Sequence, residues 1–109
     1  LQSVHCDLLH RATAYLNLAD TYRELKKFEN TLKFFKKTSE IRETKLPKNY
    51  PHLAILYYKL AKYYYDAAQY CISSKYVEKT VRIAKDKLSR THPHLADYTE
   101  TFELIGKML

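Results

Sequence analysis

The chain has 109 residues, of which 46% are hydrophobic and 28% charged, and these values are typical of a folded domain rather than of a disordered chain. No apolar run approaches the roughly 20 residues that span a bilayer, and a single Gly argues against hairpin turns and Gly-rich phosphate loops. The formal net charge of +7 favours acidic partners, namely acidic peptides, nucleic acid or anionic lipid, and does not choose among them.

The two cysteines, Cys6 and Cys71, are too few for a disulfide framework. We expect both to be reduced, buried thiols of an intracellular, cytoplasmic protein, in agreement with the missing signal-peptide pattern. The chain begins with Leu1 rather than Met, so we expect it to be a segment of a longer protein.

The sequence repeats itself with a period of 42 residues. The segment Pro-His-Leu-Ala at residues 51–54 recurs unchanged at residues 93–96, and residues 9–12 keep the His and the Ala. Such an internal repeat predicts a stack of similar structural units. Further pairs that lie 42 residues apart and match in size and polarity are Tyr15 with Tyr57, Leu18 with Leu60, Ala19 with Ala61, Tyr22 with Tyr64, Phe28 with Tyr70, Phe35 with Val77 and Thr38 with Thr80.

Apolar residues within each repeat recur at spacings of 3, 4 and 7, which predicts helices, and the strict alternation of a strand is absent. Short connections at residues 26–27 and 67–69 join the helices into antiparallel hairpins, and all three Pro residues fall between repeats. The predicted helices are 6–25, 28–45, 51–66, 70–88 and 93–108. The predicted domains are 1–50, a first repeat with an N-terminal extension; 51–92, a second repeat; and 93–109, a terminal helix.

This pattern resembles the tetratricopeptide repeat (TPR), in the 42-residue form found in kinesin light chains. The resemblance covers residues 9 to about 98 and implies an all-α, right-handed TPR-like solenoid of stacked antiparallel hairpins with about five helices. It also implies a protein-interaction module and not an enzyme. The residues that carry the resemblance are Tyr15, Leu18, Ala19, Tyr22, Phe28, Phe35, Thr38, Tyr57, Leu60, Ala61, Tyr64, Tyr70, Val77 and Thr80.

The last predicted helix departs from the pattern. It has Thr99, Phe102, Glu103 and Gly106 where the earlier first helices have Tyr, Leu, Ala and Tyr. Polar residues at these positions predict a capping helix with a solvated outer face, as solenoids need at their ends. The alternative is a repeat whose second helix has been cut away.

Residues 56–70 contain six tyrosines, and helical register divides them. Tyr57 and Tyr64 fall on the packed stripe, and Tyr63 is expected to be a flanking residue without an assigned role. Tyr58 and Tyr65 share a different face with one lysine, and the resemblance implies that this face lines the concave surface of the stack. The alternative is that these side chains pack on neighbouring structure. The predicted partner-binding residues of the concave face are Tyr58, Lys62, Tyr65, Leu16, Asp20, Arg23, Leu104 and Lys107.

Four lysines on the predicted second helices repeat with the same period and form a ladder that would lie on the convex side: Lys33, Lys37, Lys75 and Lys79. The ladder is either a solvated charged face or an electrostatic contact with nucleic acid or anionic lipid. No groove-reading or RNA-binding motif accompanies it, which disfavours nucleic acid.

The histidines do not form a metal-binding pattern. His10, His52 and His94 repeat with the same 42-residue period, which indicates a structural role, and His92 with His94 lacks further ligands for zinc. No catalytic, metal or cofactor site is predicted, and no small-molecule substrate.

The leading hypothesis for function is a scaffold that binds a peptide or partner protein, acidic in character, on the concave face. The alternatives are a basic surface that binds nucleic acid or anionic lipid, and a structural segment that associates with itself.

Overall fold

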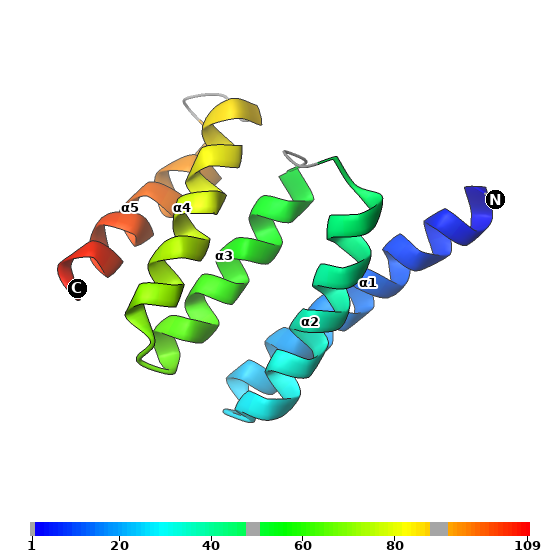
Figure 1. The fold of residues 1–109 in the computed structure, drawn as a ribbon, viewed down its shortest axis with the longest axis horizontal. Coiled ribbons are helices and arrows are strands. Elements are labelled where there is room, and N and C mark those ends of the chain that lie inside the picture. Colours follow the sequence, from blue (N-terminus) through cyan, green and yellow to red (C-terminus); the bar gives the residue numbers. More distant parts are fainter. Residues whose placement is uncertain (1, 48–50, 88–91) are drawn as a thin grey trace. The chain divides into compact units, whose positions relative to one another are not determined.

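The computed structural model describes the backbone of residues 2–47, 51–87 and 92–109, and within these ranges the side chains from residue 7 onward. These residues form five helices and no strand, as the sequence predicts (Figure 1). The first helix begins earlier than predicted, and the other bounds agree within one residue. The helices are α1 (Gln2–Glu24), α2 (Phe28–Lys45), α3 (Pro51–Asp66), α4 (Tyr70–Lys87) and α5 (Pro93–Lys107).

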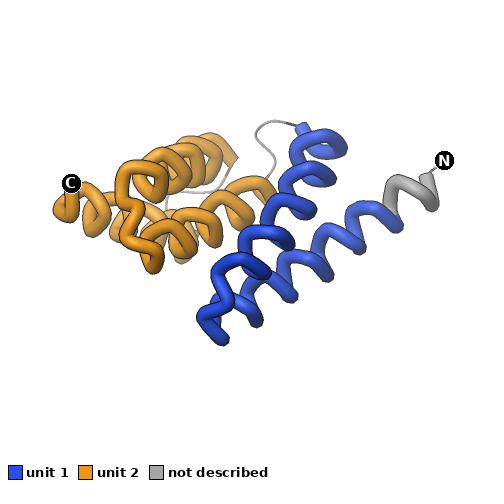
Figure 2. Tube along the Cα trace, turned by 60° about the horizontal axis from the view of Figure 1, so that its bottom comes forward, with its two compact units in different colours: residues 1–48 blue, residues 49–109 orange. Residues whose placement is uncertain are grey.

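The chain divides into two compact units, which are described separately (Figure 2). Unit 1 spans Leu1–Lys48 and consists of the antiparallel pair α1 and α2; unit 2 spans Asn49–Leu109. In unit 2, α4 packs against both α3 and α5, so that α3 and α5 run in the same direction (Figure 1). None of the described helices combines the length and apolarity needed to cross a membrane.

Both hairpins turn in the same way. Lys26 and Ala68, which lie 42 residues apart, each have φ of 60°. Beyond each of them a backbone N–H reaches back to close the helix end: Lys27 N–H donates to the Tyr22 carbonyl at 2.9 Å, and Gln69 N–H donates to the Tyr64 carbonyl at 2.8 Å. This left-handed helix ending usually has Gly, and here the chain forms it twice without Gly.

Small buried residues bring the paired helices close together. In unit 1 the Thr38 hydroxyl lies 3.2 Å from the Ala12 carbonyl across the pair and 3.0 Å from the Phe34 carbonyl of its own helix. In unit 2 the Thr80 hydroxyl lies 3.4 Å from the Ala54 carbonyl, and the Ser73 hydroxyl donates to the Ala61 carbonyl at 2.6 Å. We call this contact the small-residue seam. Its members, all at most 3% exposed, are Ala12, Ala19, Thr31 and Thr38 in unit 1, and Ala54, Ala61, Ser73 and Thr80 in unit 2.

Aromatic rings stack beside the seam at matching positions of the two units. Phe34 stacks on Tyr15 and Tyr22, with ring centroids 5.8 and 5.6 Å away. Tyr76 takes the same place in unit 2, with Tyr57 at 6.0 Å and Tyr64 at 5.7 Å. Tyr57 and Tyr64 are therefore packing residues, as predicted, although both remain half-buried.

The expectation that Tyr63 is a flanking residue without a role is wrong. Tyr63 is 7% exposed and lies on the same helical face as Leu56 (0%) and Leu60 (4%), so it belongs to the core. Its ring meets Tyr64 edge-on at 4.9 Å. Burial, and secondly the neighbouring Tyr64, raise the pKa of the Tyr63 hydroxyl.

The expectation of buried thiols is wrong for Cys71, which is exposed. Cys71 is the second residue of α4 and occupies the same repeat position as Glu29, which is also exposed. The side chain of Cys6 lies outside the described residues.

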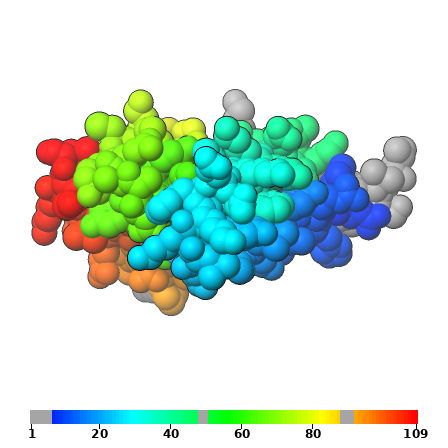
Figure 3. Space-filling model, turned by 90° about the horizontal axis from the view of Figure 1, so that it is seen from below, coloured from blue at the N-terminus to red at the C-terminus, as the bar shows by residue number. Residues whose placement is uncertain are grey.

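Helix α5 begins at Pro93 and is capped by His92, whose Nδ1 accepts a hydrogen bond from the His94 backbone N–H at 3.2 Å. Near its other end, Ile105 (1% exposed) packs with Ala61 and Val77 in one buried cluster. The space-filling view shows the red C-terminal end of α5 beside the green residues where α3 ends (Figure 3).

The flank of α5 beside this buried face is open. Phe102 is 36% exposed, and Glu103 and Gly106 are also exposed. A Cβ added at Gly106 would meet no atom within 4 Å. The capping role of α5 stays a prediction.

The buried cluster predicts that one side chain holds α5 in place. Ile105→Ala should lower the free energy of unfolding by about 2–5 kcal/mol, because it removes buried atoms and leaves a cavity. The matched control is Leu104→Ala on the neighbouring position, where the side chain is 54% exposed and little change is expected. Urea melts followed by circular dichroism measure both, and equal losses would contradict the packing of α5.

Candidate functional site

Tyr58, which the sequence assigns to the partner-binding face, contacts α5. Its ring centroid lies 4.6 Å from that of Tyr98, with the planes 57° apart. Its hydroxyl lies 3.1 Å from the Thr101 hydroxyl. The side chain is half-buried, and it joins α3 to α5 directly.

The donor in the hydrogen bond between the Tyr58 and Thr101 hydroxyls follows from a second hydrogen bond of Thr101. The Thr101 hydroxyl donates its one hydrogen to the Asp97 carbonyl at 2.9 Å. It can therefore only accept from Tyr58, whose hydroxyl must be the donor.

Tyr65, about two turns further along α3, also packs within unit 2. Its ring meets Tyr70 edge-on at 5.4 Å and lies against the cluster that contains Val77 and Ile105. The alternative in which these tyrosines pack on neighbouring structure thus describes part of their role.

Lys62 lies between the two tyrosines on the same face of α3. Its Nζ is 4.4 Å from the centroid of the Tyr58 ring, within the range of a cation–π contact, and the side chain is exposed. The ring holds the ammonium group in place while leaving it open to solvent.

On α5, the two predicted site residues are exposed. Leu104 is 54% exposed, and Lys107 is exposed near the helix end, where a cation also complements the helix dipole. We call the five predicted site residues on these two helices, Tyr58, Lys62, Tyr65, Leu104 and Lys107, the α3–α5 face.

The three remaining predicted residues lie on α1 in unit 1. Leu16 is only 4% exposed, so it offers little surface to a partner. Asp20 and Arg23 are half-buried, and each contacts other groups of the protein. Among the predicted residues, the structure shows a contact between Tyr58 and Lys62, and it joins Tyr58 to α5 through Tyr98 and Thr101.

The predicted basic ladder has an additional role within each hairpin. Lys37 Nζ lies 5.2 Å from the Tyr15 ring and 5.7 Å from the Phe34 ring. Lys79 Nζ takes the same position over Tyr57 and Tyr76, at 5.4 and 5.5 Å. The other two lysines of the ladder, Lys33 and Lys75, are exposed.

Sequence reasoning missed Tyr98, which is 4% exposed and contacts Tyr58. Burial chiefly, and then Tyr58 and Asp97, raise the pKa of its hydroxyl. The repeat contained the signal, because Tyr98 lies 42 residues after the buried Leu56.

Among the residues with described side chains, no three His, Cys, Asp or Glu come together in a way that could hold a metal ion.

The family profile of the tetratricopeptide repeat matches residues 10–86, which include both hairpins. No curated protein matches the chain.

The contact between Tyr58 and Thr101 predicts a measurable coupling. In a double-mutant cycle with Tyr58→Phe and Thr101→Val, the two substitutions should interact by about 0.5–1.5 kcal/mol, since either one removes the same hydrogen bond. Urea melts of the wild type, the single variants and the double variant give the coupling. A value near zero would show that the hydroxyls do not meet in solution.

Proposed function

Because the chain belongs to the tetratricopeptide repeat family, whose repeats are generally protein-interaction modules, we propose that its α3–α5 face binds a peptide or partner protein. The family is typically a non-enzymatic scaffold, and binding rather than catalysis is the activity proposed.

The observation that carries the proposal is the position of exposed Lys62 on the Tyr58 ring, which in turn contacts Tyr98 and Thr101 of α5. The Lys62 Nζ lies 4.4 Å from the ring centroid, and at an exposed site such a contact is worth about 0.5–1 kcal/mol, so it favours one position of the charge without fixing it. Leu104, 54% exposed, adds an apolar contact, and Lys107 adds a second charge. The ligand that fits this face is a segment with acidic residues beside an apolar one.

The packing of Tyr58 and Tyr65 indicates how these two tyrosines contribute to partner binding. Both rings contact other residues of unit 2, so they support the α3–α5 face rather than extend freely into solvent. Their removal would disturb the fold as well as binding, and a clean test must use the exposed residues instead.

We also propose the repeat subtype, the contribution of α1 and the location in the cell. We propose that the repeats are of the kinesin-light-chain type, because the 42-residue period exceeds the usual 34. Asp20 and Arg23 on α1 are proposed as partner-binding residues of unit 1, and the protein is proposed to act in the cytoplasm.

The basic ladder supports a second candidate function less well. Lys37 and Lys79 lie over rings of their own hairpins as Lys62 does, so this contact does not separate the two surfaces, but the ladder has no nucleic-acid-binding motif beside it. If the ladder binds nucleic acid or anionic lipid, the affinity should depend strongly on salt. If the chain associates with itself, its size in solution should depend on concentration.

Charge reversal on the α3–α5 face tests the proposal. Peptides selected on the wild type from a random display library should be rich in Asp and Glu. The double variant Lys62→Glu/Lys107→Glu should bind them at least about tenfold more weakly, a loss of about 1.4 kcal/mol. Isothermal titration measures the affinities, and thermal melts check that the variants remain folded.

The matched control places the same change of charge elsewhere. Lys75→Glu/Lys85→Glu alters two exposed lysines of α4 and changes the net charge by the same amount. Apart from the weakening that any such change in net charge causes, the affinity for the peptides should stay within about twofold of the wild type. Selected peptides without acidic enrichment, or equal losses in both double variants, would contradict the proposal.

A further inference from the structure

Helix α5 carries a row of charges on an exposed face. Glu100, Glu103 and Lys107 follow one another at spacings of three and four residues, so they lie on one side of the helix, and all three are exposed. Leu104, which is 54% exposed, lies among them. Two exposed carboxylates one turn apart are a local exception in a chain whose net charge is +7.

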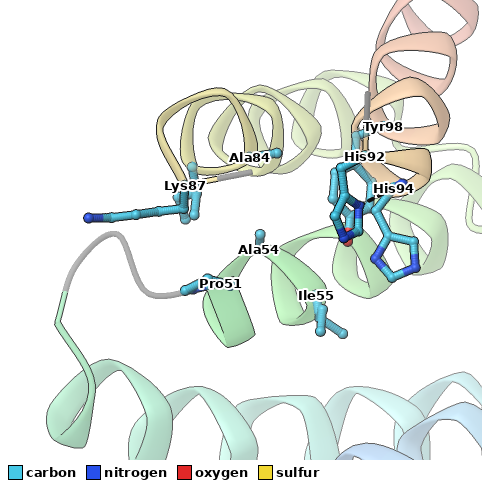
Figure 4. Close-up of a pocket in the computed structure, with 9 residues that line it drawn as sticks. Pro51, Ala54, Ile55, Ala84, Lys87, His92, His94 and Tyr98 are labelled. Carbon is cyan, nitrogen blue, oxygen red and sulfur yellow. Dashed lines mark hydrogen bonds between the residues drawn. The ribbon is translucent and has the colours of Figure 1, made fainter. Parts of the chain in front are cut away.

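The buried side of α5 holds this row in place. Near the start of the helix, Tyr98 is buried and its ring contacts Tyr58 of α3, and near the end Ile105 is buried. Figure 4 shows His92 and His94 together with Tyr98 at the start of α5. The exposed charges therefore stand on a helix that is anchored along its other side.

Helix α2 carries the opposite charges with the same spacing. Its outward residues border a surface groove of about 430 Å³, which also contains the half-buried Leu32 and Lys37. The groove thus combines an apolar residue with a row of charges. Four exposed residues of the groove follow one another at spacings of four, three and four on one side of α2: Glu29, Lys33, Lys36 and Glu40.

These charges are not neutralised within their own helices. Opposite charges four residues apart often pair on a helix, and Glu78 of α4 pairs in this way with Arg82 at 3.1 Å. The charges of the two rows therefore remain available to a partner. Within the described part of the chain, three further pairs have this spacing and form no ion pair: Glu29 with Lys33, Lys36 with Glu40, and Glu103 with Lys107.

The two rows match when the helices are placed antiparallel. Because the charges have the same spacing on both helices, a single register pairs all of them. At the far end of the groove in this register, Glu40 meets Ala96 and Lys37 meets Thr99, so no like charges face each other. The register gives three pairs of opposite charge and one apolar contact: Glu103 with Lys33, Glu100 with Lys36, Lys107 with Glu29, and Leu104 with Leu32.

We propose that α5 of one copy of the chain docks on the α2 groove of a second copy. The occupant is a second copy because both halves of the match are present in one sequence and both are exposed. Nucleic acid or anionic lipid fits the groove less well, because Glu29 and Glu40 at its two ends repel phosphate. The net charge of +7 on each copy opposes association, so the contact is weak and depends on these two patches.

Analytical ultracentrifugation of the whole chain tests the contact. Between about 10 μM and 1 mM, the average mass of the wild type should rise with concentration. Lys33→Glu/Lys36→Glu on α2 and Glu100→Lys/Glu103→Lys on α5 should each raise the dissociation constant at least about tenfold. The α2 variant has the lower net charge, which by itself favours association, so its loss reports the contact. A wild type that stays monomeric throughout would overturn the proposal.

Mixing the two reversed variants supplies the second arm. Each reversed surface then meets a surface of opposite charge on the other variant, so association should return to within about threefold of the wild type. No association in the mixture would overturn the proposal, even if each variant is monomeric alone. Leu104→Ala, which changes no charge, should also weaken association, and thermal melts identify any variant that fails to fold.

The matched control reverses two lysines outside the groove. Lys75→Glu/Lys85→Glu on α4 should still associate, and a loss equal to that of the α2 variant would overturn the proposal. The proposed function fails separately. Lys33→Glu/Lys36→Glu should leave the affinity of the α3–α5 face for a selected peptide within about twofold, because neither lysine belongs to that face.

Discussion

The small-residue seam is the contact on which the rest of the structure depends. Ala, Ser and Thr let the paired helices approach until hydroxyl groups such as that of Thr38 reach the opposite backbone. Larger side chains of the same helices, such as Phe35 and Val77, are also fully buried. The rings of Phe34 and Tyr76 stack beside the seam, where Lys37 and Lys79 lie over them. The seam and the ring stacks thus recur together in both units.

The tyrosines of α3 divide by the helix that each one contacts. Tyr57 and Tyr64 contact α4 through Tyr76, whereas Tyr58 reaches Tyr98 and Thr101 on α5. A residue that holds the terminal helix also positions the exposed groups beside it. For this reason the fold and the proposed binding surface are coupled: whatever loosens α5 also moves Leu104 and Lys107 relative to Lys62. Binding and stability must be measured together on this face.

The repeat made the helices and the hairpin packing predictable from the sequence. Pairs such as Tyr15 with Tyr57, and Phe35 with Val77, mark the same positions in both copies. Contacts that occur once were not predictable. The meeting of Tyr58 with Tyr98 joins residues 40 positions apart; their counterparts, Leu16 and Leu56, indicate burial but not an aromatic contact. Tyr63 was missed because its counterpart, Thr21, is exposed and shows no apolar signal. The burial of Arg42 in unit 1 also occurs once, because its counterpart in unit 2 is Ala84.

The central claim is that a peptide ligand binds the α3–α5 face. The most direct measurement is an NMR titration of the labelled chain with an acidic peptide selected on the wild type. The account predicts that the backbone signals of Lys62, Leu104 and Lys107 shift together, at the same peptide concentration. Shifts confined to Lys33 and Lys37 of α2 or to Lys75 and Lys79 of α4 would contradict it and would move the binding surface to the basic ladder.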